Sequence, residues 1–373
     1  MRAADTETLR QLLWICREPA TTPLPTDESA WEQLLQLALE HDIAPLLWLN
    51  LQARELPTAA RARLWAVYAA NQRRNQSLQA EHEKILAALT AGGVRAWPLK
   101  GPEMSQALYG DAAARQVADL DVLIHPDSLD AADRVLAKFG YRRAAPGRLE
   151  RFRESQELLY VRHAVEGTAF HLDLHQRLLP YVKRDPLAKR VFAEGLTPEN
   201  LLVYLCANHV SHRFARLKHL LDIERLLAKS GPTLQWDKVT QAACELEFAP
   251  GIYHSLLLVS RLAPALIPAQ PLRELRPREW ERWLLRRSAG EEPVEALAQV
   301  RRLEGPYGSF AVVAGTRGIL GRLRQAWRLL FPPTGYVRQQ YAPAPHQSTL
   351  PFYLGRLLKK VPLAVRDLVK AVF

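Results

Sequence analysis

The stretch of sequence that decides the fold is Arg115-Gln116-Val117-Ala118-Asp119-Leu120-Asp121-Val122-Leu123-Ile124. It is typical of a short β-strand that begins polar and ends apolar. Asp119 and Asp121 are two residues apart, so on a strand both side chains point to one face, while the apolar residues that alternate with them point to the other. Neighbouring carboxylates repel each other, and a hard divalent cation such as Mg²⁺, which takes oxygen ligands, would relieve the repulsion. The stretch therefore predicts a magnesium site; the alternative is that one aspartate caps the strand and the other is solvated.

The composition is that of a globular protein with more than one domain. The chain has 373 residues, of which 48% are hydrophobic and 24% are charged, and this length exceeds one small core. The formal net charge of +11 favours an anionic partner. Nucleic acid, a nucleotide, a phospholipid headgroup and a phosphorylated substrate all satisfy that requirement.

Cysteine usage and the terminal sequence indicate a cytoplasmic protein. Cys16, Cys206 and Cys244 are widely spaced and form neither a disulfide framework nor a zinc pattern, which favours a reducing compartment. The N-terminus begins a polar amphipathic segment, so we expect no signal peptide. We also expect no membrane-spanning helix, because Arg261 and Pro264 interrupt the most apolar stretch.

Hydrophobic periodicity places a small sheet between helical segments. Apolar residues recur at helical spacing through residues 1–91, the N-terminal helical region, and Gly92-Gly93 ends its last helix. The core, residues 92–195, is expected to contain strands at 94–99, 115–124, 158–161 and 170–175, a further strand or sheet edge at 141–143, and helices at 103–109 and 128–139. Thr197 is a predicted N-cap that opens a helical domain, 196–290, which a basic helical region, 291–373, follows. The predicted fold class is α+β, with a small mixed-sheet core embedded in a mostly helical chain.

Two further features point to phosphate chemistry. Lys100-Gly101 lies at a strand-to-helix turn, where glycine lets backbone N–H groups approach a phosphate and lysine adds a positive charge. Asp173 lies on an alternating strand with His171 and His175 on the same face. If that strand pairs beside the aspartate strand, Asp173 completes a carboxylate trio that could hold metal ions or supply a general base. The alternatives are an ordinary turn and a polar outer face.

At these motifs the chain resembles a known family. Leu-Lys-Gly at 99–101, Leu-Tyr-Gly-Asp at 108–111, the aspartate strand and Leu-Asp-Leu-His at 172–175 are similar to bacterial nucleotidyltransferases of the DNA polymerase beta superfamily, in particular to a poorly characterised group. The resemblance implies a mixed-sheet nucleotidyltransferase core in which Asp119, Asp121 and Asp173 hold Mg²⁺ as catalytic residues. It also implies that Lys100, Gly101 and Arg115 bind the phosphates of an NTP. The wider superfamily has Gly-Ser or Gly-Gly in the turn, whereas Pro102 follows Gly101 here, so Lys100 or Arg115 would replace the serine contact.

A histidine-rich segment follows the core. Helical periodicity predicts one continuous helix from His209 to Ala228, on which His209, His212 and His219 share an arc of about 80°. We interpret His209 and His212 as nucleotide-binding residues that line the cleft. The alternative is that these histidines are hydrogen-bonded at a seam between domains.

The C-terminal segment is strongly basic. Residues 317–373 contain ten Lys and Arg residues and one acid, Asp367, interleaved with apolar residues. Such amphipathic helices suit an anionic membrane surface or a polyanion, although they could equally pack on the other helices.

These observations favour a Mg²⁺-dependent nucleotidyltransferase that moves a nucleoside monophosphate from an NTP to an unidentified acceptor. The alternative is a non-catalytic nucleotide-binding protein or membrane-surface scaffold, with a cytoplasmic location that includes peripheral membrane contact. A transferase acting on tRNA is a third hypothesis; the charge permits nucleic acid as a partner, but no base-stacking aromatic pattern supports it.

Overall fold

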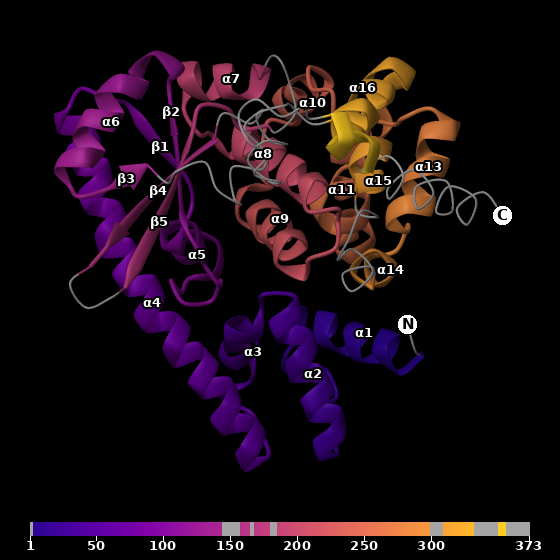
Figure 1. The fold of residues 1–373 in the computed structure, drawn as a ribbon. Helices are drawn as coiled ribbons and strands as arrows, with labels where there is room; N and C mark the ends of the chain where they lie inside the picture. Colours follow the sequence, from indigo (N-terminus) through magenta and orange to yellow (C-terminus); the bar gives the residue numbers. More distant parts are fainter. Residues whose placement is uncertain are drawn as a thin grey trace.

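The computed structural model describes residues 3–143, 157–164, 168–179, 185–298, 309–331 and 350–355. A five-stranded sheet is surrounded by helices, as Figure 1 shows. The predicted α+β class is therefore confirmed. None of the helices in these ranges combines the length and apolar character that a membrane span needs.

The sheet contains β1 (Ala96–Lys100), β2 (Leu120–Ile124), β3 (Arg142–Arg143), β4 (Glu157–His163) and β5 (Ala169–His175). Their spatial order is β1-β2-β5-β4-β3. β2 and β5 run parallel, and the other neighbours pair antiparallel, so the sheet is mixed. The strand with Asp173 thus lies beside the strand with Asp121, as the sequence led us to expect.

The helices on the N-terminal side are α1 (Ala3–Arg17), α2 (Glu28–Glu40), α3 (Ala44–Leu51) and α4 (Thr58–Ala91), followed within the sheet region by α5 (Pro102–Tyr109) and α6 (Leu129–Lys138). Those after the sheet are α7 (Pro186–Glu194), α8 (Pro198–Ser211), α9 (Leu217–Ser230), α10 (Trp236–Cys244), α11 (Ala249–Leu262), α12 (Ala269–Glu274), α13 (Glu279–Ala289), α14 (Pro293–Leu297), α15 (Ser309–Ala314) and α16 (Gly318–Leu330). As predicted, the side chain of Thr197 caps α8, by accepting a hydrogen bond from the backbone N–H of Asn200.

One face of the sheet packs against α4 and α6. The apolar residues Leu120, Val122 and Ile124 of β2 are buried there with Leu78, Ile85 and Leu89 of α4 and with Ala132 and Leu136 of α6. The first half of α4 belongs to a second core formed with α1–α3, because Leu64 packs in that cluster. The long helix α4 therefore connects the N-terminal helices to the back of the sheet (Figure 1).

The other face of the sheet is turned toward α8 and α9. Leu123, the apolar residue of β2 that points this way, belongs to the helical core with Leu202, Leu205 and Leu220. Asp121 points to the same side, since it contacts Lys100 and His175. The alternation of β2 therefore places Asp121 at the junction between sheet and helices. The predicted strand at 115–124 is too long: β2 begins only at Leu120, because the segment before it is held by hydrogen bonds to side chains of α4, so Asp119 precedes the strand.

The predicted single helix from His209 to Ala228 is wrong. The helix α8 ends at Ser211, and Arg213 and Phe214 have positive φ angles of 65° and 62°. α9 begins only at Leu217. No glycine or proline marks this break in the sequence, and tertiary packing holds the two residues in the left-handed region, where Phe214 is fully buried.

Candidate functional site

Three charged residues form a row across the sheet. On antiparallel strands Lys100 of β1 lies opposite Asp121 of β2, at an irregularity in the register. On parallel strands Asp121 lies opposite Asp173 of β5. Strand pairing alone therefore brings Lys100, Asp121 and Asp173, separated by up to 73 positions in sequence, to one level of one sheet.

Asp121 is buried and held by two cationic or hydrogen-bonding neighbours. Its Oδ1 lies 2.9 Å from Nε2 of His175, and its Oδ2 lies 3.7 Å from Nζ of Lys100. Burial by itself would raise the pKa of Asp121. The charge of Lys100 and the hydrogen bond with His175 outweigh burial, so the net pKa lies well below the ordinary value and the carboxylate is ionised.

Lys100 connects this row to the helices. Its Nζ donates to Oδ1 of Asn208 on α8 at 3.3 Å and lies 5.7 Å from the ring centroid of Tyr204. Burial would lower the pKa of Lys100, but Asp121, Tyr204 and Asp119 raise it further than burial lowers it. Lys100 is therefore a fixed positive charge at the site, and Asp119 lies close enough to interact with it.

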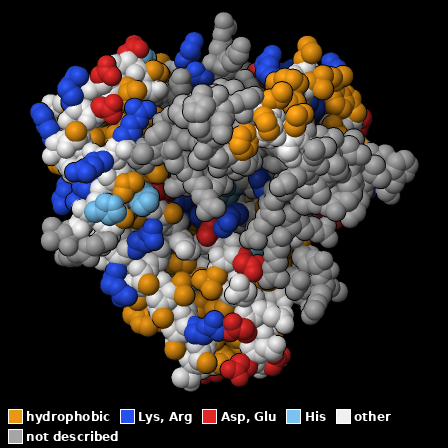
Figure 2. All heavy atoms as spheres, viewed as in Figure 1, with side chains coloured by type: hydrophobic (Ala, Val, Ile, Leu, Met, Phe, Trp, Pro, Cys, Tyr) orange, Lys and Arg blue, Asp and Glu red, His pale blue; other side chains and the backbone are white. Residues whose placement is uncertain are grey.

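The turn between α8 and α9 continues the network. Nδ2 of Asn208 donates to Nδ1 of His219 at 3.1 Å, and the rings of His219 and His212 stack with centroids 4.4 Å apart. Burial, together with nearby cations, lowers the pKa of His219, so its ring is neutral near pH 7. His212 is exposed to solvent. In Figure 2 the molecule is hollowed between the sheet and α9, and Lys or Arg, Asp or Glu, and His side chains gather there.

Arg115 takes part in a buried ion pair. Its Nε donates to Oδ2 of Asp222 on α9 at 3.0 Å, and the hydroxyl of Tyr109 donates to Oδ1 of the same carboxylate at 2.8 Å. The arginine side chain is 5% exposed and the aspartate is fully buried. The structure thus places Arg115 between the sheet region and α9, where its guanidinium positions the loop before Asp119 and adds positive potential at Asp121.

That loop is fixed by the polar residues of α4. The side-chain amides of Asn71 and Asn75 donate to the backbone carbonyl of Arg115 at 3.2 Å and 2.9 Å. Arg74 donates to the carbonyl of Ala118 at 2.8 Å. The two asparagines satisfy the buried backbone carbonyl of Arg115, and together with Arg74 they hold the segment that enters β2.

Gly101 forms the predicted strand-to-helix turn. It separates β1 from α5 and has a φ of 151°, a region that favours glycine. The helix N-terminus expected to receive a phosphate already has a carboxylate beside it, because Glu103 lies in the first turn and its Oε1 is 2.9 Å from Nδ1 of the buried His82. Burial would raise the pKa of Glu103, but the hydrogen bond with His82 lowers it below the ordinary value.

His209 does not reach this site. Its ring is fully buried, with Nδ1 3.2 Å from the hydroxyl of Ser255 on α11 and a ring contact to Phe214. Burial and the neighbouring His254 lower its pKa to about 3. The interpretation of His209 as a nucleotide-binding residue is corrected: the break after α8 leaves it in the core, while His212 lies with Lys100 and His219.

Sequence reasoning missed Asn208, which joins Lys100 to His219, and the role of His175 as the partner of Asp121. The alternation of β5 already placed His175 on the face of Asp173, so a signal existed for it. For Asn208 there was none, because its contacts come from elements 108 and 11 positions away.

The carboxylate oxygens of the aspartates at this site are the type of ligand that Mg²⁺ prefers. Asp121 and Asp173 are register neighbours on β2 and β5, and Asp119 lies two residues before Asp121 in the chain. No group of three His, Cys, Asp or Glu side chains among the described residues is arranged to hold a metal ion. Mg²⁺ commonly takes only one or two carboxylates, with water and substrate phosphates completing its coordination, so Asp121 and Asp173 are the residues of the row that could hold it.

Comparison with known proteins identifies the class. The family described as uncharacterised nucleotidyltransferase matches residues 27–264, which include the sheet, α8 and α9. No curated protein and no solved structure matches the chain. The matched range contains Lys100, Asp121 and Asp173 and the helix α8, whose Asn208 contacts Lys100.

Proposed function

The chain belongs to the uncharacterised nucleotidyltransferase family, and from this premise we propose that it transfers a nucleoside monophosphate from an NTP to an acceptor in a Mg²⁺-dependent reaction. The observation that supports this most is the row of Lys100, Asp121 and Asp173 in register across β1, β2 and β5. The carboxylates of Asp121 and Asp173 suit the metal ion of a metal-bound triphosphate, and the positive charge of Lys100 suits its phosphate oxygens.

Asp119 and Asp121 would hold the metal, and Asp173 would be either its third ligand or the general base. When bound, Mg²⁺ would offset the negative charge of the triphosphate and polarise the phosphorus under attack. His175 keeps Asp121 oriented through its 2.9 Å contact with Oδ1. Lys100 binds phosphate oxygens from the side of α8.

The reaction we propose balances as follows. A hydroxyl, phosphate or amine of the acceptor forms a bond to the α-phosphorus, the bond to the β-phosphate oxygen breaks, and pyrophosphate leaves. Asp173 is partly exposed and takes the proton when the acceptor is a hydroxyl or an amine. Asp121 is a poor proton acceptor, because its pKa is depressed.

Transfer of labelled nucleotide tests this function. The protein is incubated with mixed NTPs, Mg²⁺ and a cell extract, and products are identified by mass spectrometry. We expect Asp121→Asn to lower transfer by about a hundredfold or more, since a metal contributes several kcal/mol to such a step. The control is Asp127→Asn, whose side chain is 90% exposed beside α6. Full transfer by Asp121→Asn would contradict the proposal.

A second candidate is nucleotide binding without turnover. It is favoured by the partners that Asp121 already has, Lys100 and His175, and by Glu103 at the start of α5. Calorimetry with a non-hydrolysable NTP, alongside the transfer assay, separates the two functions: the second candidate requires binding with no product.

Membrane-surface contact is a separate proposal for the C-terminal region. On α16 the side chains of Ile319, Leu320, Leu323 and Trp327 are exposed. Arg322 and Arg324 of the same helix form ion pairs with Glu281 and Glu247, which neutralise part of the positive charge of α16. The predictions for residues 332–349 and 356–373 lie outside the described residues. Flotation with anionic and neutral vesicles tests the contact, which requires binding to the anionic ones.

A further inference from the structure

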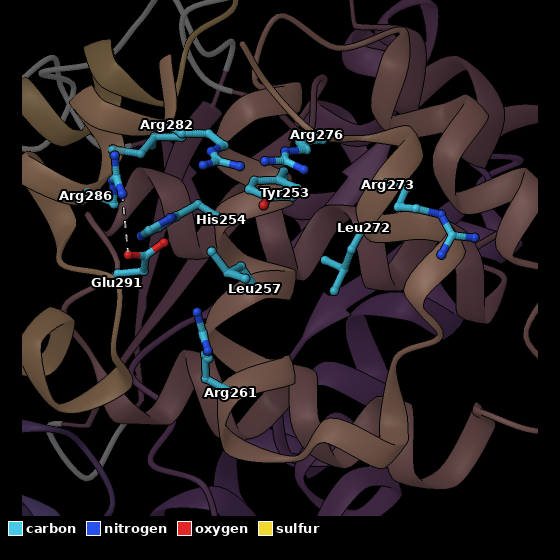
Figure 3. Close-up of a pocket in the computed structure, with 11 residues that line it drawn as sticks. Tyr253, His254, Leu257, Arg261, Leu272, Arg273, Arg276, Arg282, Arg286 and Glu291 are labelled. Atoms are coloured by element: carbon cyan, nitrogen blue, oxygen red, sulfur yellow. Dashed lines mark ion pairs between the residues drawn. The ribbon is translucent and has the colours of Figure 1, made fainter. Parts of the chain in front are cut away.

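A cavity of about 330 Å³ lies among α11, α12 and α13, away from the row on the sheet (Figure 3). Five arginines contribute to its wall: Arg261, Arg273, Arg276, Arg282 and Arg286. Glu291 is the carboxylate among its wall residues. Such a concentration of guanidinium groups around a concave space creates a positive potential that attracts anions.

The acids nearby neutralise these arginines only in part. Arg276 and Arg282 share Glu279, at 3.3 Å and 2.9 Å, and the Glu279 side chain is 72% exposed. Arg286 lies 3.9 Å from Glu291, and Arg261 lies 3.7 Å from Glu292. These three carboxylates thus pair with four guanidinium groups, and ion pairs with such exposed carboxylates contribute little energy.

The side chains converge on the cavity from two sides. In Figure 3 Arg276 and Arg282 extend toward each other next to the hydroxyl of Tyr253, Arg286 points to Glu291, and Arg273 points away. Tyr253 and His254 are buried and form the floor. His254 donates to the backbone carbonyl of Gly290, which ties the floor to the end of α13.

A layer of packed rings separates this cavity from the proposed transfer site. His254 contacts Phe214 edge-on at 4.9 Å between centroids, and Phe214 contacts His209 at 5.2 Å. His209 is buried in the core, one helical turn before His212 at the end of α8. A ligand in the cavity would therefore not touch Lys100 or Asp121.

We propose that this cavity is a second anion site that binds a small compound carrying phosphate groups. The planar fork of arginine matches phosphate oxygens in a bidentate manner, and several forks around one space suit more than one phosphate group. The volume lies at the lower end of the range of small-molecule pockets. Nucleic acid is the less favoured partner, because a polymer needs an extended basic track, whereas the guanidinium groups of Arg261, Arg276, Arg282 and Arg286 gather at a single cavity.

The test measures binding of inorganic pyrophosphate to the full-length protein by calorimetry in the presence of EDTA, which removes metal-dependent binding at the row. We expect one saturable site per chain. The variant Arg282→Gln with Arg286→Gln should weaken binding at least about tenfold, because two charged hydrogen-bond donors are lost. The matched control is Arg287→Gln, on the same helix α13 but outside the cavity wall, which should bind as the parent does.

Further variants keep the result decisive. Asp121→Asn should leave pyrophosphate binding in EDTA unchanged, so failure of the proposed transfer function would not affect this outcome. If the double glutamine variant does not fold, as judged by circular dichroism, the double lysine variant replaces it and should also weaken binding, because lysine lacks the bidentate fork. Absence of saturable binding, binding unchanged by the arginine substitutions, or displacement of pyrophosphate by a tighter-binding single-stranded oligonucleotide would overturn the proposal.

Discussion

Asp121 and Asp173 face the same side of the sheet from register-matched positions on the parallel strands β2 and β5. Each residue is 52 positions from the other, yet strand pairing fixes their separation without any contribution from loops. Lys100 extends the row on the opposite side of Asp121. Charges on three adjacent strands are held more rigidly than charges on loops, which favours a site that needs defined geometry.

Removing the lysine of the row should impair the proposed transfer. Lys100→Met leaves Asp121 and Asp119 without their shared cation and removes the hydrogen bond to Asn208. We expect kcat/KM for the NTP to fall by about ten- to a hundredfold, the equivalent of about 1.5–3 kcal/mol for hydrogen bonds to charged groups. Steady-state kinetics provide the measurement. The control is Lys138→Met, which removes an exposed lysine of α6; equal losses in both variants would argue against a specific role for Lys100.

The buried pair of Arg115 and Asp222 should dominate stability at the sheet–helix junction. Arg115→Met leaves a fully buried carboxylate without its cation, and such changes cost about 3–5 kcal/mol. Urea unfolding measures the loss. Arg324→Met breaks the more exposed pair with Glu247 and should cost less than about 1 kcal/mol.

A double substitution tests the cause of that loss. Arg115→Met combined with Asp222→Leu removes both charges and should recover part of the stability, because the uncompensated charge is gone. If the double variant were less stable than Arg115→Met alone, packing of the arginine would explain the effect better than charge.

Stability should fall with acid because buried histidines, among them His254 and His209, resist protonation in the folded chain. Burial lowers the pKa of His254 to about 4 and that of His209 to about 3, from 6.5. Below about pH 6.5 the unfolded chain gains protons that the folded chain does not, so the free energy of unfolding falls between pH 6.5 and about 4. The loss from His254 is roughly 1–3 kcal/mol.

Urea unfolding from pH 4.5 to 7 measures this slope. His254→Phe replaces the imidazole with a ring that does not titrate, next to Phe214, and should flatten the pH dependence. An unchanged slope in this variant would show that other groups cause the acid sensitivity.

Alanine should be poorly tolerated at Gly101. Its φ of 151° is unfavourable for a side chain, and a Cβ there would lie 2.7 Å from Oε2 of Glu103. We expect a loss of about 1–3 kcal/mol in unfolding free energy. Gly110→Ala is the matched control, because Gly110 also has positive φ but its Cβ would meet nothing within 4 Å. Thermal melting of both variants separates the two effects, because Gly110→Ala introduces backbone strain alone and Gly101→Ala introduces strain and the contact with Glu103. A smaller loss of stability in Gly101→Ala than in Gly110→Ala would contradict this account.

The sequence by itself determined the local elements and the faces of the strands. Alternation along 120–124 and 170–175 placed Asp121 and Asp173 on one side of the sheet and most apolar residues on the other, because a strand has a period of two. Gly101, Gly92 and Thr197 marked turns and caps that the structure contains. These features depend on neighbours within a few residues, so a single sequence suffices to predict them.

Tertiary structure alone decided what the charged residues contact. Arg115 suits a phosphate in the sequence but meets Asp222, which is 107 positions away, and His209 is withdrawn into the core by the break at Arg213 and Phe214. Asn208 contacts Lys100 only because α8 packs against the face of the sheet on which Asp121 lies. Such contacts result from the balance between burial and pairing across the whole chain, and local periodicity contains no information about that balance.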